Sequence, residues 1–427
     1  MSKKVNIIGA GFSGLTAAYY LQQQGFDVHV YEKSSTVGGL IQKKQCDYGF
    51  YETAANGIMG QAHILKFLND LGVKYQPSSD KAKKRFILRE KLTRWPLKFV
   101  ETLKLVFKVI VNFLILKKHK KINYSQLSVA SWVEQFLTTE AKKYLIEPGL
   151  KGIYAGSIEE LSSQLIIQPL FKKKSPQYKS VIPLVSGHDG FHDILEQVKD
   201  RLVSLGVHIH LNTTNAFQIV EKSLVEKTPV ILATSAKDAL ALIEKINEQD
   251  KDLNTVVHFL KQIELVPIVS VTAFFKSPPS DQYIGFGCLF PQSEGLKPLG
   301  VLMNNVIFNR QSSFHSETWI FGGAFNSDVM QMTDEQFKES IMAARRKIFQ
   351  SEEMPLEVKI TRWDKALPHF TLKHENNLSQ FKQHPLLKLH GNYLNVIGVS
   401  KIIVESQKLA HDLKEQSIKE ILSSEIH

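Results

Sequence analysis

A glycine-rich turn close to the start of the chain limits most strongly what this protein can fold into. The run GAGFSG at residues 9–14 lies between a short apolar stretch, 5–8, and a helix-forming stretch, 15–24. A second apolar stretch, 27–31, ends directly before Glu32. In this order the first glycine makes the tight turn, the second admits a pyrophosphate close to the backbone, and the third packs helix on strand. The helix N-terminus offers free N–H groups to the phosphates, and the acid can bind ribose hydroxyls. The sequence therefore predicts a dinucleotide-binding fold.

A second glycine pair, in the run VGGL at residues 37–40, follows the acid closely. An acid followed by two glycines at this distance resembles the extended FAD signature of the amine oxidase, phytoene desaturase and protoporphyrinogen oxidase group. A dinucleotide fold that opens a chain also commonly serves a resident cofactor. We therefore expect FAD, and the motif leaves NAD as the alternative.

Composition and charge limit the compartment and the partners. Hydrophobic residues make up 43% of the 427 residues and charged residues 22%, as in a soluble globular protein. The net charge of +11 favours anionic partners, namely nucleic acid, anionic lipid or a polycarboxylate. Nucleic acid is disfavoured because no nucleic-acid-binding motif is present. The only cysteines, Cys46 and Cys288, give no disulfide framework, and the first strand directly after Lys4 leaves no room for a targeting peptide. These features predict a cytoplasmic protein.

Two histidines, His208 and His210, lie in a predicted strand and would share one of its faces. The sequence offers no third ligand beside them, and zinc sites need at least three protein ligands. No metal site is therefore predicted.

The stretch 98–121 combines an apolar surface with positive charge. Most of its residues are apolar, Lys104, Lys108 and Asn112 recur every four residues, and the basic run KKHKK closes it at 117–121. This polar stripe interrupts the ~20 apolar residues that a membrane-spanning helix needs. Two interpretations remain open: a basic amphipathic helix on an anionic membrane surface, at the inner face of the cell membrane, or a helix packed on its own domain with its lysines in water.

Several more segments share one family's pattern. The most specific is GIYAG at 152–156 with ELS at 160–162; the others are YETAANG at 51–57, KRFIL at 84–88 with WPL at 95–97, GFGCLFP at 285–291, RWDKALP at 362–368 and GNYL at 391–394. Together they resemble the oxygen-dependent protoporphyrinogen and coproporphyrinogen oxidases of haem synthesis. The chain lacks the late Cys-Tyr pair to which many amine oxidases attach flavin covalently, so the FAD is expected to be non-covalent.

The resemblance implies an α/β chain with the Rossmann-like FAD fold of two dinucleotide-binding domains. It also implies an inserted mixed-sheet substrate domain and a helical subdomain, for which membrane association is left open. Strands at 206–211, 229–234 and 393–398 are expected to join the N-terminal sheet. The expected divisions are 1–80, 181–262 and 386–427 for the FAD-binding parts, 81–180 for a helical, membrane-facing and substrate region, and 263–385 for the substrate-binding sheet.

The resemblance also implies the site residues. Arg85 is expected to clamp a substrate carboxylate, Gly156 to admit a flat macrocycle close to the backbone, and Cys288 and Leu289 to line an apolar wall. No residue is predicted as a catalytic base. The residues predicted to bind the cofactor are Gly9, Gly11, Phe12, Ser13, Gly14, Glu32, Lys33, Gly39, Leu40, Ala55, Asn56, Gly57, Trp363, Ile397, Gly398 and Val399.

The implied reaction removes hydrides from a porphyrinogen to flavin until six electrons have left, with dioxygen as the acceptor. Three departures from the family pattern keep alternatives open: AA at 54–55 replaces Gly-Pro, Val396 replaces a glycine, and SQ at 406–407 replaces the Ser-Gly that opens the last helix. The alternatives are an amine oxidase or desaturase acting on another apolar substrate, and a non-enzymatic flavoprotein or tetrapyrrole carrier. A homodimer is also left open.

Overall fold

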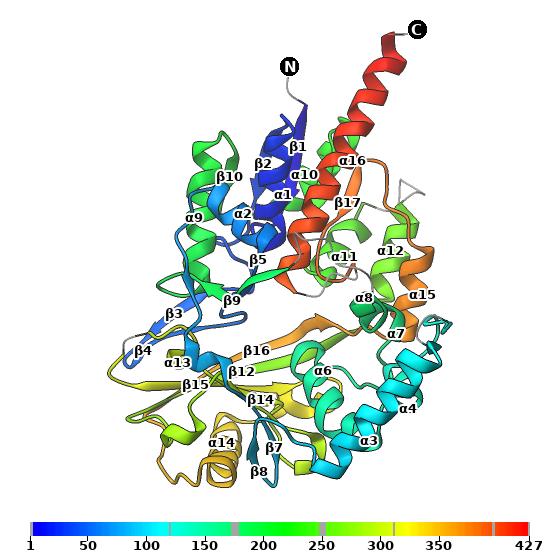
Figure 1. The fold of residues 1–427 in the computed structure, drawn as a ribbon. Helices are drawn as coiled ribbons and strands as arrows, with labels where there is room; N and C mark the ends of the chain where they lie inside the picture. Colours follow the sequence, from blue (N-terminus) through cyan, green and yellow to red (C-terminus); the bar gives the residue numbers. More distant parts are fainter. Residues whose placement is uncertain are drawn as a thin grey trace.

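The computed structural model describes residues 3–118, 121–171, 179–246, 253–310, 312–394 and 398–425. Two large sheets lie one above the other, with a group of helices beside the lower sheet (Figure 1). The mixed α/β class expected from the sequence is confirmed. None of the helices in the described ranges is long and apolar enough to cross a membrane.

The upper sheet has five parallel strands in the order β10-β2-β1-β11-β17. It gathers three distant stretches of chain: β1 (Lys4–Ile8) and β2 (Asp27–Tyr31), then β10 (His208–His210) and β11 (Val230–Leu232), and finally β17 (Leu387–Leu389). The expected strands at 206–211 and 229–234 are confirmed as β10 and β11. Of the expected strand at 393–398, residues 395–397 lie outside the described residues, and 393–394 belong to a turn in which Tyr393 is buried. Within the described ranges, the strand of this sheet that comes last in the chain is β17.

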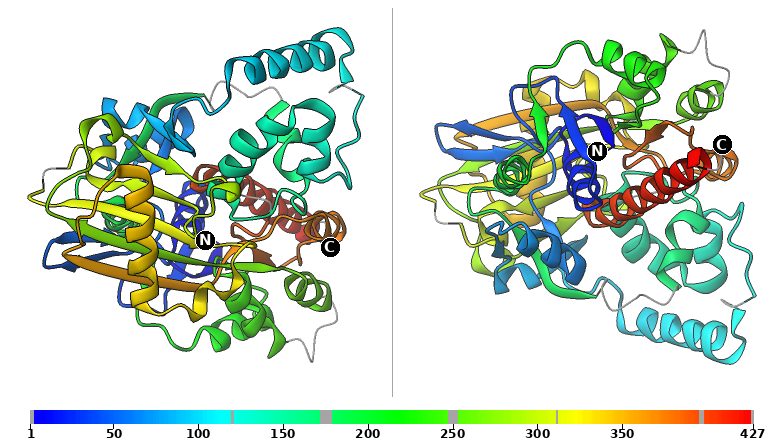
Figure 2. Two further views of the ribbon diagram at one scale, coloured as in Figure 1. Left: turned by 90° about the horizontal axis from the view of Figure 1, so that it is seen from below. Right: turned by 90° about the horizontal axis from the view of Figure 1, so that it is seen from above.

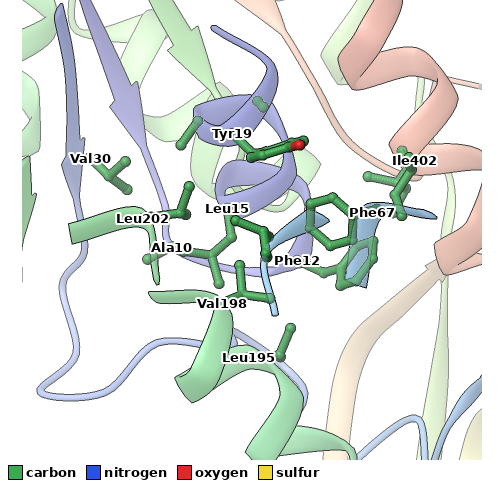
Figure 3. Packing of buried hydrophobic residues seen from close by; sticks show 14 of the residues in the cluster. Ala10, Phe12, Leu15, Tyr19, Val30, Phe67, Leu195, Val198, Leu202 and Ile402 are labelled. Atoms are coloured by element: carbon green, nitrogen blue, oxygen red, sulfur yellow. The ribbon is translucent and has the colours of Figure 1, made fainter. Parts of the chain in front are cut away.

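Helices cover both faces of this sheet. Strand alternation turns Val28 and Val30 of β2 toward one face, where α1 packs with residues such as Leu15 (Figure 3). The helices of this layer are α1 (Phe12–Gln23), α2 (Ala62–Asp70), α9 (Phe191–Ser204) and α16 (Val399–Glu425). On the other face, Ile8 and Leu232 pack against α10 (Ala216–Val225), α11 (Ala236–Glu244) and α12 (Leu253–Lys261), beside α15 (Leu372–Gln380).

The lower sheet has seven strands in the order β16-β12-β15-β14-β13-β7-β8, antiparallel except for the parallel pair β13 and β7. One face packs on α14 (Asp334–Phe349), which lies below the sheet in Figure 1, and the other faces the upper sheet. The strands are β7 (Arg85–Arg89), β8 (Lys91–Thr93), β12 (Leu265–Phe275), β13 (Gly287–Leu289), β14 (Gly300–Met303), β15 (His315–Gly322) and β16 (Glu357–Pro368).

Smaller elements connect these layers. A hairpin of β3 (Lys43–Cys46) and β4 (Gly49–Glu52) and a three-stranded sheet of β5 (Ile58–Gln61), β9 (Ser180–Ser186) and β6 (Gln76–Pro77) lie between the large sheets, next to α13 (Asn304–Ile307). The helical group contains α3 (Phe99–Val109), the π-helix Ile110–Ile115, α4 (Val129–Phe136), α5 (Thr139–Ala141), the π-helix Lys142–Ile146, α6 (Glu147–Tyr154), α7 (Ser163–Ile166) and α8 (Gln168–Phe171).

Helix α3 stands at the outer edge of the molecule (Figure 2) and has no buried residue. The polar stripe points partly inward: Lys108 Nζ donates to the carbonyl oxygens of Glu134 and Leu137 at 2.9 and 2.6 Å, and Asn112 is buried and contacts the Gln135 carbonyl. The alternative in which the lysines of a packed helix point to water is thus wrong for Lys108. Instead, most apolar side chains of α3 face outward, as does Lys104; the exposed apolar residues are Phe99, Val100, Leu103, Val106 and Phe107. His119 and Lys120 of the basic run lie outside the described residues.

Candidate functional site

The glycine turn after β1 has no space for side chains at its two ends. Gly9 has φ +104°, and a Cβ there would lie 2.8 Å from the carbonyl oxygen of Ala233, directly after the neighbouring strand β11. A Cβ on Gly14 would lie 1.9 Å from the carbonyl oxygen of Gly9. The first glycine thus permits the turn, and the third permits α1 to pack on it.

The start of α1 is free to receive an anion. Its N-cap is Gly11, which supplies no side-chain cap, and its first turn, with Phe12 and Ser13, carries no acidic residue. The N–H groups of a first helical turn have no partner within the helix. The helix dipole adds positive potential at the same place, so this terminus suits a pyrophosphate.

Glu32, the acid predicted to bind the ribose, lies buried directly after β2. One carboxylate oxygen accepts a hydrogen bond from the Ala10 N–H (2.8 Å) and the other from the Ser34 N–H (2.9 Å), which holds the carboxylate beside the turn. Lys33 follows at the surface, 3.9 Å from Asp238. Glu32 still has lone pairs for hydroxyl donors, because an ionised carboxylate accepts at about four positions.

The second glycine pair lies against the first turn. Gly38 N–H donates to the Ala10 carbonyl (2.8 Å) and forms an isolated parallel bridge with Gly11. A Cβ on Gly39, which has φ +61°, would lie 3.3 Å from Gly11 Cα. Side chains at Gly11 and Gly39 would fill the narrow space between these two loops. The bare backbone on both sides, the uncapped helix and the fixed carboxylate together fit FAD.

Trp363, on β16, links the lower sheet to the segment after the glycine pair. Its indole Nε1 donates to the carbonyl oxygen of Thr53 (2.9 Å), and the Thr53 hydroxyl donates to the carbonyl oxygen of Leu40 (2.6 Å). Leu40 itself remains 42% exposed. Thr53 thus joins two residues predicted to bind the cofactor. It lies in the family-like run 51–57 but was not among the predicted site residues, because the segments that it joins are more than 300 residues apart in the chain.

The next residues of the same loop are tied to both layers. Ala55 packs on the core of the upper layer, and Asn56 donates from Nδ2 to Asn304 Oδ1 on α13 (3.1 Å). A Cβ on Gly57 would lie 2.7 Å from the Phe308 ring, so this glycine is explained by tight packing.

At the C-terminal end of the predicted cofactor site, Gly398 has φ +86° and Val399 begins α16. Ile397 and Val396 lie outside the described residues. The expectation that Ser406 opens the last helix is wrong, because the helix begins at Val399. Ser406 is instead buried within α16 and hydrogen-bonds to Thr16 of α1 and to His390, both at 2.8 Å.

The upper face of the lower sheet carries Arg85 and Leu289. Arg85 is exposed and its guanidinium lies 4.8 Å from the centroid of the Phe286 ring. Leu289 pairs with Ile87, two residues along from Arg85, and contacts the Gly152 position on α6. Because alternate residues of a strand share a face, the cation and these apolar side chains lie on one surface.

Cys288 lies on the opposite face. It is 3% exposed, packs in the core between the sheet and α14, and burial raises the pKa of its thiol. The expectation that Cys288 and Leu289 line one wall is therefore wrong for Cys288, since adjacent strand residues point to opposite faces. Gly156 is also closely packed: a Cβ there would lie 2.8 Å from Leu161 and 3.0 Å from His369.

A cavity of about 110 Å³ lies between the hairpin of β3 and β4 and the lower sheet. Of its lining residues, only Asn56 was among the site residues predicted from the sequence. Its walls include Glu52, Arg310, Phe50 and Phe274. Glu52 Oε2 lies 3.6 Å from Arg310 Nη1, and both side chains are largely buried. Burial raises the pKa of Glu52, and the cation of Arg310 opposes that change. No local pattern could pair these residues, because 258 positions separate them (310 − 52).

Comparison with known proteins agrees with this geometry. The profile of the family described as flavin containing amine oxidoreductase matches residues 12–394. Protoporphyrinogen oxidase 2 of Arabidopsis thaliana is 23% identical, over 96% of this chain and 93% of its own length. Coproporphyrinogen III oxidase of Staphylococcus aureus is 32% identical, over 43% of this chain and 42% of its own.

Solved structures share the fold. A protein from Exiguobacterium sp. 255-15 superposes with a TM-score of 0.74 at 18% identity, covering 97% of this chain and 99% of its own. Putrescine oxidase bound to putrescine superposes with a TM-score of 0.69 at 15% identity, covering 97% of this chain and 99% of its own. The expected cofactor and enzyme class are thereby confirmed: the chain belongs to the flavin-containing amine oxidoreductase family and is an FAD-dependent oxidoreductase.

Proposed function

We propose that the chain is a porphyrinogen oxidase, which converts protoporphyrinogen IX or coproporphyrinogen III to the porphyrin with dioxygen as the electron acceptor. The observation that carries this proposal is the set of relatives aligned over almost the whole chain. They are named protoporphyrinogen oxidase in Arabidopsis, Nicotiana tabacum and Dictyostelium discoideum, and alignments with them cover 94–97% of this chain.

The upper face of the lower sheet supports this substrate class. A porphyrinogen combines a large apolar ring system with propionate groups, so its site needs apolar surface beside a cation. Leu289 and Ile87 provide apolar surface, and Arg85 lies on the same face. A guanidinium can bind a carboxylate with two parallel hydrogen bonds, and its contact with the Phe286 ring holds it partly oriented.

In this proposal FAD, when bound, accepts hydride from the substrate carbon, and the substrate loses six electrons and six protons in three such rounds. The chain's own residues hold the cofactor and orient the substrate beside it. Gly11, Gly39 and the first turn of α1 hold the pyrophosphate, and Glu32 holds the ribose. The bond from Trp363 to Thr53 fixes the substrate sheet against the cofactor loop.

An anaerobic reduction experiment tests this function. Purified FAD-loaded protein is mixed without oxygen with protoporphyrinogen, coproporphyrinogen or putrescine, and air is then admitted. We expect flavin bleaching with at least one porphyrinogen, then porphyrin fluorescence, peroxide and renewed flavin colour in air. Bleaching by putrescine alone would establish an amine oxidase, and bound porphyrinogen without bleaching would establish a carrier.

Charge reversal tests the role of Arg85. The variant Arg85→Glu should raise KM for a porphyrinogen at least about tenfold while kcat changes less, because a lost carboxylate bond weakens binding by about 1.5–3 kcal/mol. Arg85→Lys should recover part of the loss. Lys81→Glu is the matched control, since it makes the same charge change at an exposed position nearby. Equal kinetics for Arg85→Glu and Lys81→Glu would refute the carboxylate clamp.

The outward apolar face of α3 supports peripheral contact with an anionic membrane as part of the same function. Phe99 is 78% exposed, Phe107 70% and Leu114, in the following π-helix, 68%. Lysines lie at both ends of this surface, including Lys98 and Lys118. Exposed apolar side chains next to basic residues are typical of helices that lie in the headgroup region of anionic bilayers.

Vesicle sedimentation tests this contact. The protein should bind vesicles containing phosphatidylglycerol more strongly than vesicles of phosphatidylcholine alone, and Phe107→Ser should weaken binding. Val225→Ser on α10 is the control, because Val225 is 79% exposed on another surface. A concentration-dependent dimer that Phe107→Ser dissociates, without vesicle binding, would show that a second copy covers this face instead.

A further inference from the structure

Four ligand-type side chains gather on neighbouring strands at the edge of the upper sheet. Asp27 and His29 come from β2, and His208 and His210 come from β10. The two strands are parallel and in register, with His208 opposite His29 and His210 opposite Tyr31. Because alternate residues share a face, all four side chains lie on one surface of the sheet. The sequence showed only the His208 and His210 pair; strand pairing supplies the missing partners.

The distances within this group match those of a metal-ligand set. Single ligand atoms of Asp27, His29 and His208 all lie within 4.8 Å of one another. His29 Nε2 lies 3.3 Å from one Asp27 carboxylate oxygen, and His208 Nε2 lies 3.7 Å from the other. Two ligands on one tetrahedral Zn²⁺ lie about 3.3 Å apart, given zinc–ligand bonds of about 2.0–2.1 Å.

We propose that Asp27, His29 and His208 form a binding site for a divalent transition-metal ion of the Zn²⁺ class, which joins the edge strand β10 to β2. Two imidazoles and a carboxylate suit zinc and its neighbours, and a water completes the tetrahedron. The site lies on the dinucleotide-binding sheet and does not depend on the proposed oxidase function.

His210 orients the central ligand of this site. Its Nε2 lies 3.3 Å from His29 Nδ1, on the opposite side of the His29 ring from Asp27. When His29 donates its Nδ1–H to His210, its Nε2 lone pair is left free on the side of Asp27. Metal-bound histidines almost always donate their other ring N–H to such a partner, and that bond fixes the ring and its tautomer.

The surroundings allow an ion to reach the site. The His208 side chain is 55% exposed and stacks on His29 with ring centroids 4.5 Å apart, so it has room to turn toward an ion.

The test uses the full chain without an affinity tag, stripped of metal with a chelator and titrated with Zn²⁺ in competition with a zinc-binding dye. We expect one Zn²⁺ per chain. His208→Ala and Asp27→Asn should each weaken binding at least about tenfold, and His210→Ala about 10- to 100-fold through the lost orientation of His29. Co²⁺ should give the visible spectrum of a tetrahedral site in the wild type and lose it in His208→Ala.

The matched control is His411→Ala on α16, because His411 is an exposed histidine that also lies near two carboxylates, Asp412 and Glu415. Its removal should leave zinc affinity unchanged. Unaltered affinity in His208→Ala, or equal loss in His411→Ala, would overturn the proposal. Thermal unfolding gives a second readout: Zn²⁺ should raise the Tm of the wild type and of His411→Ala, but not that of His208→Ala.

Discussion

Helices α1 and α3 are both rich in apolar residues, yet α1 is buried in the protein and α3 lies at its surface. Eight of the twelve residues of α1 are buried, and the helix packs against the sheet, α9 and α16. None of the eleven residues of α3 is buried, and its outward face carries Phe99, Leu103 and Phe107. The apolar content of a helix therefore does not determine which side of it faces water.

The polar contacts of the two helices explain the difference. Helix α1 is tied into the interior by a buried network, in which Thr16 meets Ser406 and Ser406 meets His390. Helix α3 is held from its polar side by two contacts. Glu101 pairs with Arg89, and Lys108 donates to the carbonyl oxygens of Glu134 on α4 and of Leu137 directly after α4. Once the polar side of α3 is used for attachment, its apolar side remains at the surface.

The largest expected effect comes from filling the turn before α1. Gly14→Ala would place a methyl group 1.9 Å from the Gly9 carbonyl oxygen, and both atoms belong to a fixed backbone. We expect the free energy of unfolding to fall by about 3 kcal/mol or more, and the variant to lose its bound FAD. Urea unfolding measures the stability, and flavin absorbance per chain measures the bound FAD. The control is Gly149→Ala in α6, which has no atom within 4 Å of the new methyl and should keep its flavin.

A matched pair of leucine truncations tests the contrast directly. Leu15→Ala in α1 removes a fully buried side chain and should cost about 2–5 kcal/mol. Leu103→Ala in α3 removes a side chain that is 53% exposed and should change the unfolding free energy by less than about 0.5 kcal/mol. Similar costs in the two variants would show that α3 packs against the protein in solution.

The buried network at α1 should make stability depend on pH. Burial lowers the pKa of His390 from 6.5 to about 4, so the unfolded chain takes up the proton first as the pH falls. The stability gained from burying the neutral His390 ring is complete above pH 6.5. It is lost as the pH falls from 6.5 to about 4, and the loss is about 2 kcal/mol at pH 5. His374, also lowered to about 4, adds a similar loss. In urea unfolding, the free energy of unfolding of His390→Asn should fall less between pH 6.5 and pH 4 than that of the wild type. His411→Ala should follow the wild type.

The smallest effect is expected at the attachment of α3. Hydrogen bonds from Arg89 lower the pKa of Glu101 from 4.5 to about 2, so the pair stabilises the fold above pH 4.5 and this contribution is lost as the pH falls toward 2. The Arg89 and Glu101 side chains keep 13% and 18% of their surface exposed, so water screens the pair and Glu101→Gln should cost about 1 kcal/mol or less. Faster proteolysis within α3, with an unchanged global Tm, is the expected result. A large drop in Tm would mean that α3 supports the core.

The geometry of the glycine turn and its acid could be predicted from the sequence because its requirements are mostly local. Gly9, Gly14 and Glu32 lie within one strand-turn-helix-strand unit, and each is required by backbone contacts inside that unit or by the adjoining strand. The family resemblance added distant members such as Trp363, whose side chain reaches the cofactor loop. Its chemical role there remains a prediction.

The sequence-based predictions were wrong where the role of a residue depends on its neighbours in space. Cys288 faces the core beside α14, because the alternation of side chains along β13 turns it to that side of the sheet. Ser406 lies inside a helix that begins seven residues earlier, at Val399. The Glu52 and Arg310 pair and the zinc-type ligand set each join segments that are distant along the chain.

The sequence alone determined the dinucleotide turn and its acid, because bond geometry and steric exclusion act over a few neighbouring residues. It also determined the family, since the motifs of that family are spread over most of the chain. Only the tertiary structure decided the direction of the apolar face of α3, the wall to which Cys288 belongs and the partners of His208. Those outcomes depend on strand order and helix packing, which bring together residues that share no local pattern.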